Sequence, residues 1–210
     1  MSLRAVIFDY GMVLTGPPLA EAHEAMVRLT GLAPDRFEAL YWTDRHAYDE
    51  GKLTGLEFWQ KLLADAGIPA TPTLVAELNQ HDARMWTTQN PAMLAWQLAL
   101  KERGLRTAIL SNMGDSVLDN MKRTFTWLSR FDVLIWSYQH RMAKPDHAIY
   151  HHTLAELGTQ PAETLFIDDK AVNIEAARDL GLQAIQFSTV EQLRSDLIAL
   201  GFDKQLPLPA

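Results

Sequence analysis

Short apolar runs recur along the chain, and each is about as long as one β-strand. Residues 3–8 read LRAVIF, with almost no alternation between apolar and polar positions. A strand buried on both faces shows such a continuous run, whereas a half-solvated strand alternates. Four later runs have the same character, the last one more weakly: residues 105–111, 132–137, 164–169 and 182–187. The pattern therefore predicts a sheet of about five strands.

Helical patterns separate these runs in the second half of the chain. One begins at Pro91 and ends at Gly104, which matches the preference for proline just inside a helix and glycine just past it. The others cover residues 115–128, 146–157, 171–180 and 190–200. Strands that alternate with helices form a parallel sheet covered on both faces. We expect an α/β fold with a doubly wound, Rossmann-like parallel sheet.

Residues 17–90 interrupt this alternation because they contain helical patterns only. These patterns cover residues 19–31, 34–51, 54–67 and 71–86. In one of them, Thr54 and Glu57 have the spacing of a capping box. Ligands of parallel sheets bind beyond the carboxyl ends of the strands, so a helical insert after the first strand is expected to cover a site as a cap. The predicted domains are a core of residues 1–16 and 91–210 and an all-helical cap of residues 17–90.

Composition narrows the class of protein. The formal net charge is −7, which argues against a nucleic-acid-binding face. There is no cysteine, which removes disulfides and thiolate chemistry and fits a reducing compartment. Asp9 interrupts the only candidate signal sequence, and no run of about 18 apolar residues could span a membrane. We expect a soluble, cytoplasmic protein with a small-molecule partner, and no pattern indicates its oligomeric state.

Polar side chains collect where the predicted strands end. In chain order they are Asp9, Ser111, Asn112, Lys144, Asp168 and Asp169. The carboxyl ends of parallel strands share one edge, so these groups are expected to converge. Carboxylates without cysteine or a tight histidine set suit Mg²⁺, while hydroxyl, amide and ammonium groups suit phosphate oxygens. Such a set fits phosphoryl transfer, with Asp9 as candidate nucleophile forming an aspartyl-phosphate.

The order FDYG, LSN, KP and FIDD resembles the four motifs of the haloacid dehalogenase-like (HAD) hydrolases. The resemblance covers essentially the whole chain, including a helical cap between the first motif and the second strand. It implies that Asp9 is the nucleophile and that Ser111 and Asn112 bind the phosphate, the latter through its backbone or side chain. It also implies that Lys144 neutralises the phosphate charge.

The same resemblance implies a Mg²⁺ site. Its ligands would be Asp9, the backbone carbonyl of Gly11 and Asp169, with Asp168 beside them as a direct or water-mediated ligand. Asn173 stands where many members of the family carry another aspartate that supports the metal site.

Two positions depart from the pattern of most phosphatases in the family. Gly11 stands where they carry a second aspartate, which protonates the leaving oxygen and later activates water. Met12 replaces the next glycine. The chain is most similar to a branch that reads Asp-x-Gly-x-Val, some of whose members are phosphatases of sugar phosphates. We therefore predict a modified but active site, in a Mg²⁺-dependent phosphatase of a small phosphorylated metabolite.

Two alternatives stay open at the level of sequence. One is a metal-independent 2-haloacid dehalogenase, in which Asp9 displaces halide from carbon and the pair at Asp168 and Asp169 has no evident purpose. The other is a non-catalytic binding or regulatory protein that retains the fold, which Gly11 and Met12 favour and the otherwise complete set of motifs disfavours. In the cap, Arg45 and His46 are the candidates for contacting the substrate, because they stand near the loop-like YDEGKLTG segment.

Overall fold

The computed structural model describes residues 2–210 and contains one parallel sheet with the strand order β3–β2–β1–β4–β5. The strands are β1 (Ala5–Phe8), β2 (Arg106–Ser111), β3 (Val133–Trp136), β4 (Thr164–Asp168) and β5 (Gln183–Gln186). Phe8 lies opposite Ile109 on one side and Ile167 on the other. The three central strands therefore end almost level, at one edge of the sheet. The predicted five-stranded α/β fold is confirmed.

Helices and short turns occupy much of the rest of the described chain. In order they are η1 (Tyr10–Leu14), α1 (Ala20–Thr30), α2 (Pro34–Thr43), α3 (Arg45–Asp49), α4 (Gly55–Ala66), α5 (Pro72–Met85), α6 (Pro91–Glu102), α7 (Asp115–Thr124), η2 (Thr126–Arg130), α8 (Ser137–His140), α9 (His147–Leu157), η3 (Pro161–Glu163), α10 (Ala171–Asp179), α11 (Val190–Ala199) and η4 (Phe202–Lys204). Within residues 2–210, no helix combines the length and the apolar character that a membrane crossing requires.

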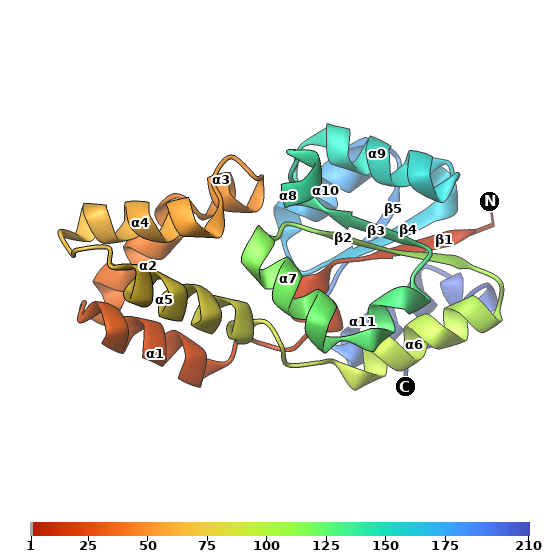
Figure 1. Ribbon diagram of the computed structural model, residues 1–210. Helices are drawn as coiled ribbons and strands as arrows, with labels where there is room; N and C mark the ends of the chain where they lie inside the picture. The colour runs from red at the N-terminus through yellow and green to blue at the C-terminus, as the bar shows by residue number, and fades with distance from the viewer. Residues whose placement is uncertain (1) are drawn as a thin grey trace.

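Side chains of the central strands alternate between two apolar layers. Ile7 and Phe166 belong to the layer under α9 and α10. Phe8 and Ile167 belong to the layer shared with α6, α7 and α11. Figure 1 shows the sheet in the middle, with α9 and α10 on one face and α6 and α11 on the other. Because both faces are covered, the central strands are apolar along most of their length, which is the pattern that the sequence displays.

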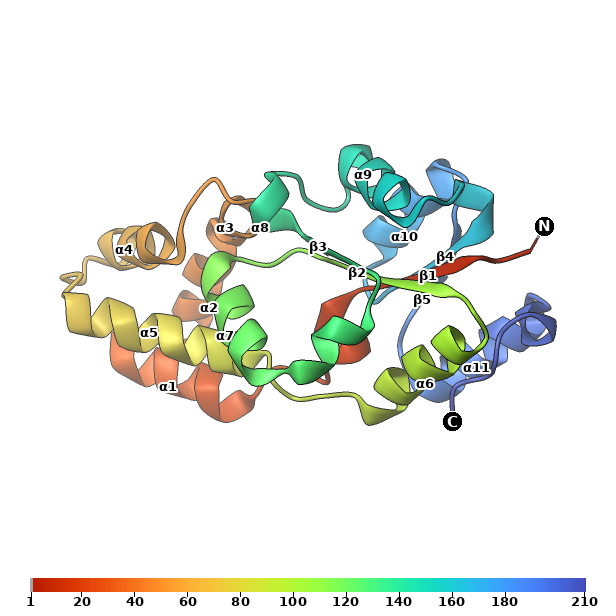
Figure 2. The same ribbon diagram turned by 45° about the vertical axis from the view of Figure 1, so that its right-hand side comes forward.

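Helices α1 to α5 lie together beyond one end of the sheet (Figures 1 and 2). They form an apolar cluster of their own, which includes the buried side chains of Phe37, Trp59 and Leu78. Thr54 caps α4 as expected, since its hydroxyl accepts from the amide of Glu57 while the Glu57 carboxylate accepts from the amide of Thr54. These helices occupy the segment that the sequence predicts to be a cap.

Two helical patterns are divided in the structure. The one over residues 115–128 breaks at Phe125, whose backbone is extended, between α7 and η2. The sequence predicts continuous helix over residues 34–51, but α2 ends at Thr43 and α3 begins at Arg45. Asp44 between them has φ −110° and ψ 7°, outside the helical range, and its carboxylate lies 2.9 Å from Nζ of Lys61. Because of this break, α3 is not a continuation of α2 and runs in its own direction. The short helix α8 directly after β3 is also absent from the prediction.

The chain passes between the sheet and these helices twice, and the two crossings are paired. The amide of Gly16 donates to the carbonyl of Thr88, and the amide of Asn90 donates to the carbonyl of Leu14, each at 2.9 Å. The pairing is antiparallel. The two crossings therefore form a short two-stranded ribbon.

Helices α3 and α4 also contact the beginning of α7 closely. Oδ1 of Asp115 accepts from the hydroxyl of Tyr48 and from the amide of Gly55, both at 3.0 Å. Gly114 lies so near the Tyr48 ring that an added Cβ would stand 2.1 Å from Cζ. This contact closes the α1–α5 unit over the carboxyl end of the sheet.

Candidate active site

Asp9 is the first residue after β1, and the sheet fixes its backbone. Its amide donates to the carbonyl of Ile167 at 2.9 Å, which extends the ladder between β1 and β4 by one residue. Its Oδ1 accepts from the amide of Tyr10 at 2.7 Å. The side chain is buried except toward a cavity in front of the strand ends. Asp9 is therefore held by the most rigid part of the molecule and faces open space.

Lys144 joins two of the carboxylates. Its Nζ lies 2.9 Å from Oδ1 of Asp9 and 2.6 Å from Oδ2 of Asp168. Burial by itself would lower the pKa of Lys144, but the charges of Asp168 and Asp9 outweigh it and raise that pKa. Lys144 therefore stays positively charged in a place where water cannot solvate it.

Asp168 is fully occupied by donors from the protein. Besides Lys144, its carboxylate accepts from the amide of Lys170 at 2.8 Å and from Nδ2 of Asn173 at 2.9 and 3.0 Å. Burial alone would raise the pKa of Asp168, but Lys144 and these hydrogen bonds together hold it below its usual value. Asp168 is ionised and is placed to position Lys144.

Asp169 differs from its neighbour. Within residues 2–210 its carboxylate makes no hydrogen bond, and it lines the cavity half-buried, beside Asp9. Burial and the nearby charge of Asp168 raise its pKa. A carboxylate with free oxygens at this place can accept a ligand that the protein itself does not supply.

The donor set fits a hard divalent cation. Asp9, Asp168 and Asp169 each offer an oxygen, and these oxygens lie within 4.8 Å of one another. All the donors are carboxylate oxygens, which suit Mg²⁺ better than softer metals. Asp9 and Asp168 share the ammonium of Lys144, and the exposed Lys170 lies near Asp169, so three carboxylates face two ammonium groups and the cluster lacks positive charge. In keeping with this, burial raises the pKa of Asp9 to about 7, against the influence of Lys144.

The side chain of Asn112 binds the backbone of Lys144, whereas its motif suggests that it binds a phosphate. Its Nδ2 donates to the carbonyl of Lys144, and its Oδ1 accepts from the amide of Lys144, both at 2.8 Å. The side-chain amide therefore fixes the loop that carries the lysine, and the backbone of Asn112 is the part left for a ligand. Ser111 is buried at the end of β2, and its hydroxyl makes no hydrogen bond to the described residues while it faces the cavity.

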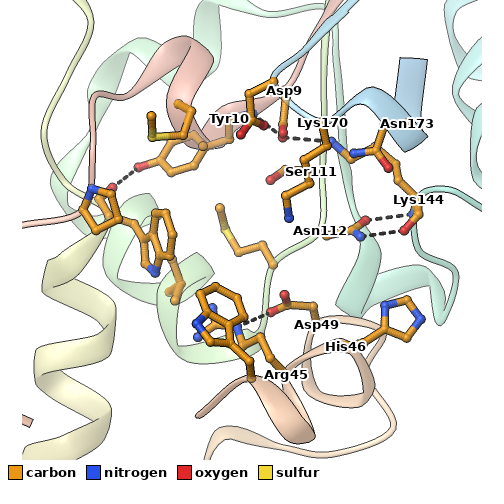
Figure 3. Close-up of a pocket in the computed structure, with 18 residues that line it drawn as sticks. Asp9, Tyr10, Arg45, His46, Asp49, Ser111, Asn112, Lys144, Lys170 and Asn173 are labelled. Atoms are coloured by element: carbon orange, nitrogen blue, oxygen red, sulfur yellow. Dashed lines mark hydrogen bonds and ion pairs between the residues drawn. The ribbon is translucent and has the colours of Figure 1, made fainter. Parts of the chain in front are cut away.

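The cavity has a volume of about 400 Å³ and lies between the strand ends and the helices α2 and α3 (Figure 3). Every site residue predicted from the sequence lines it except Asp168, which lies beneath the surface. Several further residues complete the wall: Tyr10, Met12, Pro18, Trp42, Asp49, Trp86, Met113, Val117, Lys170 and Asn173. The structure therefore gathers residues from four strand ends and from the helical segment around one space.

Arg45 reaches the cavity but is tied to carboxylates of its own segment. Its Nε lies 3.0 Å from Oδ1 of Asp49, and its Nη1 lies 3.0 Å from Oδ1 of Asp82. His46 is different, because its side chain is 63% exposed at the mouth and lies 3.7 Å from the Glu50 carboxylate. The sequence analysis missed Asp49, although its spacing of four residues from Arg45 is that of an ion pair on one helix face.

The turn after Asp9 accommodates both departures from the family pattern. Gly11 has φ −63° and ψ 137°, which any residue can adopt, and an added Cβ would meet only Cζ3 of Trp86, at 3.9 Å. Met12 has φ 61°, in the left-handed region that favours glycine. The backbone thus keeps a conformation suited to glycine at position 12, although a methionine occupies it.

Known proteins resemble this chain in sequence along most of its length. The family model of haloacid dehalogenase-like hydrolases matches residues 3–181. Bifunctional epoxide hydrolase 2 of Mus musculus is 30% identical over 203 residues, which are 88% of this chain and 36% of that protein. This chain thus spans about a third of that relative's length. The D-ribitol-5-phosphate phosphatase of Bacteroides thetaiotaomicron is 26% identical over 207 residues, 94% of this chain and 98% of the relative.

Solved structures share the fold. A HAD family enzyme of Bacteroides thetaiotaomicron, in complex with magnesium and inorganic phosphate, superposes with a TM-score of 0.76 at 21% identity, over 89% of this chain and 95% of that one. An L-2-haloacid dehalogenase of Xanthobacter autotrophicus superposes with a TM-score of 0.67 at 20% identity, over 94% and 83%. A relative named a phosphatase and a structural neighbour named a dehalogenase both resemble this chain, so the choice between the two reactions depends on the site.

Proposed function

Because this chain belongs to the haloacid dehalogenase-like hydrolases, we propose that it is a Mg²⁺-dependent phosphatase of a small phosphorylated metabolite. The observation that carries the proposal is the convergence of Asp9, Asp169 and Lys144 on one cavity, with carboxylate oxygens close enough to share a cation. The helices of residues 17–90 act as its cap.

The residues that would hold Mg²⁺ are Asp9, Asp169 and the backbone carbonyl of Gly11, with Asp168 beneath them. When bound, the ion supplies positive charge to the non-bridging oxygens of the phosphate. Asp169 is the best-suited ligand of the pair because its oxygens are free, whereas those of Asp168 accept hydrogen bonds from Lys144, Lys170 and Asn173.

The protein's own groups divide the remaining work. Asp9 attacks phosphorus in line and forms the aspartyl-phosphate, while Lys144 holds the attacking carboxylate in place and balances the charge of the phosphate. The hydroxyl of Ser111 and the backbone of Asn112 bind phosphate oxygens. The cap excludes bulk water while the bond to phosphorus forms and breaks.

Two relatives support this reaction and suggest a substrate class. One is named a phosphatase of ribitol 5-phosphate, and a protein of the same fold was crystallised with magnesium and inorganic phosphate. The cavity of about 400 Å³ suits a metabolite of comparable size, and its wall combines charged groups with Trp42 and Trp86. A phosphorylated polyol or sugar fits these features.

A dehalogenase is the less suited alternative. Displacing halide from carbon requires no cation, and Asp169 would then place a second carboxylate beside the nucleophile without a partner. Like charges at such a distance disfavour the ionised nucleophile that the reaction needs.

The test is a screen of product release with the purified chain. Phosphate release is measured from sugar, polyol and nucleotide monophosphates with Mg²⁺ and with a chelator, and halide release is measured from 2-haloacids. We expect phosphate release that requires Mg²⁺ and is lost in Asp9→Asn. Halide release without metal, or no turnover of either class, would overturn the proposal.

A further inference from the structure

Among the described residues on the core side of the cavity, no carboxyl group is free to protonate a leaving oxygen, and Lys170, which also lines the cavity, carries an ammonium group instead. Gly11 carries no side chain, Asp9 is the proposed nucleophile, and Asp169 is a proposed metal ligand. Lys144 is bound by two carboxylates. An alkyl or sugar oxygen leaves slowly without a proton, and general acid assistance is typically worth about 10²- to 10⁴-fold in rate. A reaction at this edge therefore needs an acid from elsewhere.

Asp49, the last residue of α3, is an acid in the right part of the cavity. Its side chain is 15% exposed and lines the cavity. Figure 3 shows it on the α3 side, facing the group of Asp9, Ser111 and Asn112 across the open space. One oxygen accepts from Nε of Arg45 at 3.0 Å, while the other makes no hydrogen bond to residues 2–210. Asp49 thus directs a free carboxyl oxygen toward the place where a leaving group would lie.

The backbone of Asp49 is fastened to the core. Its carbonyl accepts from the hydroxyl of Ser137, and the same hydroxyl oxygen accepts from the amide of Met113 at 2.8 Å. Met113 follows the Ser111–Asn112 pair directly. The position of Asp49 is therefore set relative to the proposed phosphate-binding loop and not only relative to the cap.

Burial favours the protonated form of Asp49. Arg45 has one positive charge and faces two carboxylates, since its Nη1 also contacts the two oxygens of Asp82 at 3.0 and 3.2 Å. Asp82 also accepts from the hydroxyl of Tyr41 at 2.7 Å. Burial raises the pKa of Asp49; Arg45 and the more distant Lys170 oppose the rise, and the charge of Asp82 adds to it. Charged or titratable groups around it are Arg45, His46 and Tyr48 of α3, Tyr41 of α2, Asp82 of α5 and Lys170 of the core.

We propose that Asp49 is the general acid and base of this site and replaces the carboxyl that Gly11 lacks. The proposal rests on the phosphatase function proposed above. As Asp9 forms its bond to phosphorus and the bond to the leaving oxygen breaks, the proton of Asp49 passes to that oxygen and the alcohol departs. In the second step the Asp49 carboxylate takes a proton from water, whose oxygen attacks phosphorus. This attack releases Asp9 and inorganic phosphate and leaves Asp49 protonated again.

Asp49→Asn tests the proposal because asparagine keeps an oxygen that can accept from Arg45 but has no acidic proton. Single-turnover release of the alcohol is measured with Mg²⁺ for butyl phosphate and for p-nitrophenyl phosphate. We expect the variant to lose about 10²- to 10⁴-fold on butyl phosphate. On p-nitrophenyl phosphate, whose phenolate leaves without a proton, we expect a loss of less than about tenfold.

Glu50→Gln is the matched control. Glu50 is the neighbouring carboxylate and lies 2.6 Å from Nζ of Lys52, but it does not line the cavity. This variant should keep both rates, and the melting temperature of each variant reports its folding. The wild-type pH profile gives a second measurement that needs no variant. The rate of alcohol release from butyl phosphate should fall as pH rises through the pKa of Asp49, while release from p-nitrophenyl phosphate should lack this decline.

Each contrary outcome has a distinct meaning. Equal losses on both substrates would mean that Asp49 only positions other groups, and no loss would mean that it has no role; either overturns the inference while the phosphatase function stands. The same holds if the two substrates have the same wild-type pH profile. Failure of the wild type to release alcohol from either ester would overturn the phosphatase function itself.

Discussion

The two walls of the cavity are built in different ways. On the core wall, Asp9 directly follows β1 and Ser111 is the last residue of β2, so the sheet fixes their positions through its backbone. On the cap wall, Arg45 and Asp49 belong to a five-residue helix that is held by side-chain pairs and by contacts to Ser137 and to Asp115 of the core. A changed side chain on the core wall should therefore reduce the rate of reaction without moving its neighbours. A changed side chain on the cap wall should also shift the positions of the other groups there.

Asp9→Asn should have the largest effect. It removes the nucleophile and one negative charge from the metal site but keeps the shape of the side chain, so turnover should fall by at least about 10³-fold. Phosphate release and the melting temperature are measured on the same preparation. A folded variant that releases phosphate at the wild-type rate would refute the assigned role.

Asp168→Asn and Asp169→Asn should separate two tasks within the core wall. Asp169→Asn should raise the Mg²⁺ concentration needed for half-maximal activity by about tenfold or more, because it weakens a ligand with free oxygens. Asp168→Asn should instead destabilise the fold by about 1–3 kcal/mol, since it removes one of the two charges that face buried Lys144 and leaves Asp9 as the other. Mg²⁺ titrations and urea unfolding of both variants decide the matter, and equal Mg²⁺ shifts would mean a shared metal site.

Gly11→Asp tests whether a carboxyl on the core wall can replace the proposed proton donor on the cap wall. The backbone at position 11 is open to any residue, so the new carboxyl can supply the proton that Asp49 is proposed to donate. In the Asp49→Asn background, Gly11→Asp should speed hydrolysis of butyl phosphate by about tenfold or more, a gain drawn from the typical range of acid assistance. In the wild type the gain should be smaller. A double-mutant cycle of single-turnover rates measures the difference. Equal gains in both backgrounds would mean that the carboxyl at position 11 and Asp49 do not donate the same proton.

Gly114→Ala should disturb the cap wall without touching the chemistry. Its methyl group would overlap the Tyr48 ring, and such overpacking costs about 1–3 kcal/mol. Gly11→Ala adds the same methyl group where its nearest neighbour is 3.9 Å away, so it should change stability by less than about 0.5 kcal/mol. Urea unfolding compares the two variants, and an unchanged Gly114→Ala protein would show that the contact between α3 and α7 is loose.

The pH dependence of stability should show the smallest effect. The pKa of Asp49 is raised in the folded protein, so its contribution to stability is complete below the unfolded pKa and is lost as pH rises through the folded value. Asp49→Asn lacks this loss, and its melting temperature relative to wild type should therefore increase as pH rises above about 4, the usual pKa of an unfolded aspartate. Thermal unfolding at several pH values measures it, and parallel curves would mean that Asp49 titrates normally.

The sequence predicts the core wall far better than the cap wall. Continuous apolar runs identify the strands, and in a parallel sheet their last residues must meet at one edge, so Asp9, Ser111 and Asp169 could be placed without coordinates. Asp49 could not be placed in this way. Its direction depends on the break at Asp44, which no periodicity indicates, and on a contact with Ser137, which is 88 residues away in the chain.

The paired ribbon that joins the two parts has a mechanical and an evolutionary consequence. Both crossings run side by side, from Leu14 to Gly16 and from Thr88 to Asn90, so a motion of the helical unit relative to the sheet would be confined to one hinge. Because the junctions are adjacent, the whole unit is also exchangeable, since an insert with neighbouring ends leaves the host sheet undisturbed. Replacement of residues 17–90 by another helical unit would alter substrate range while the strand-end chemistry stays in place.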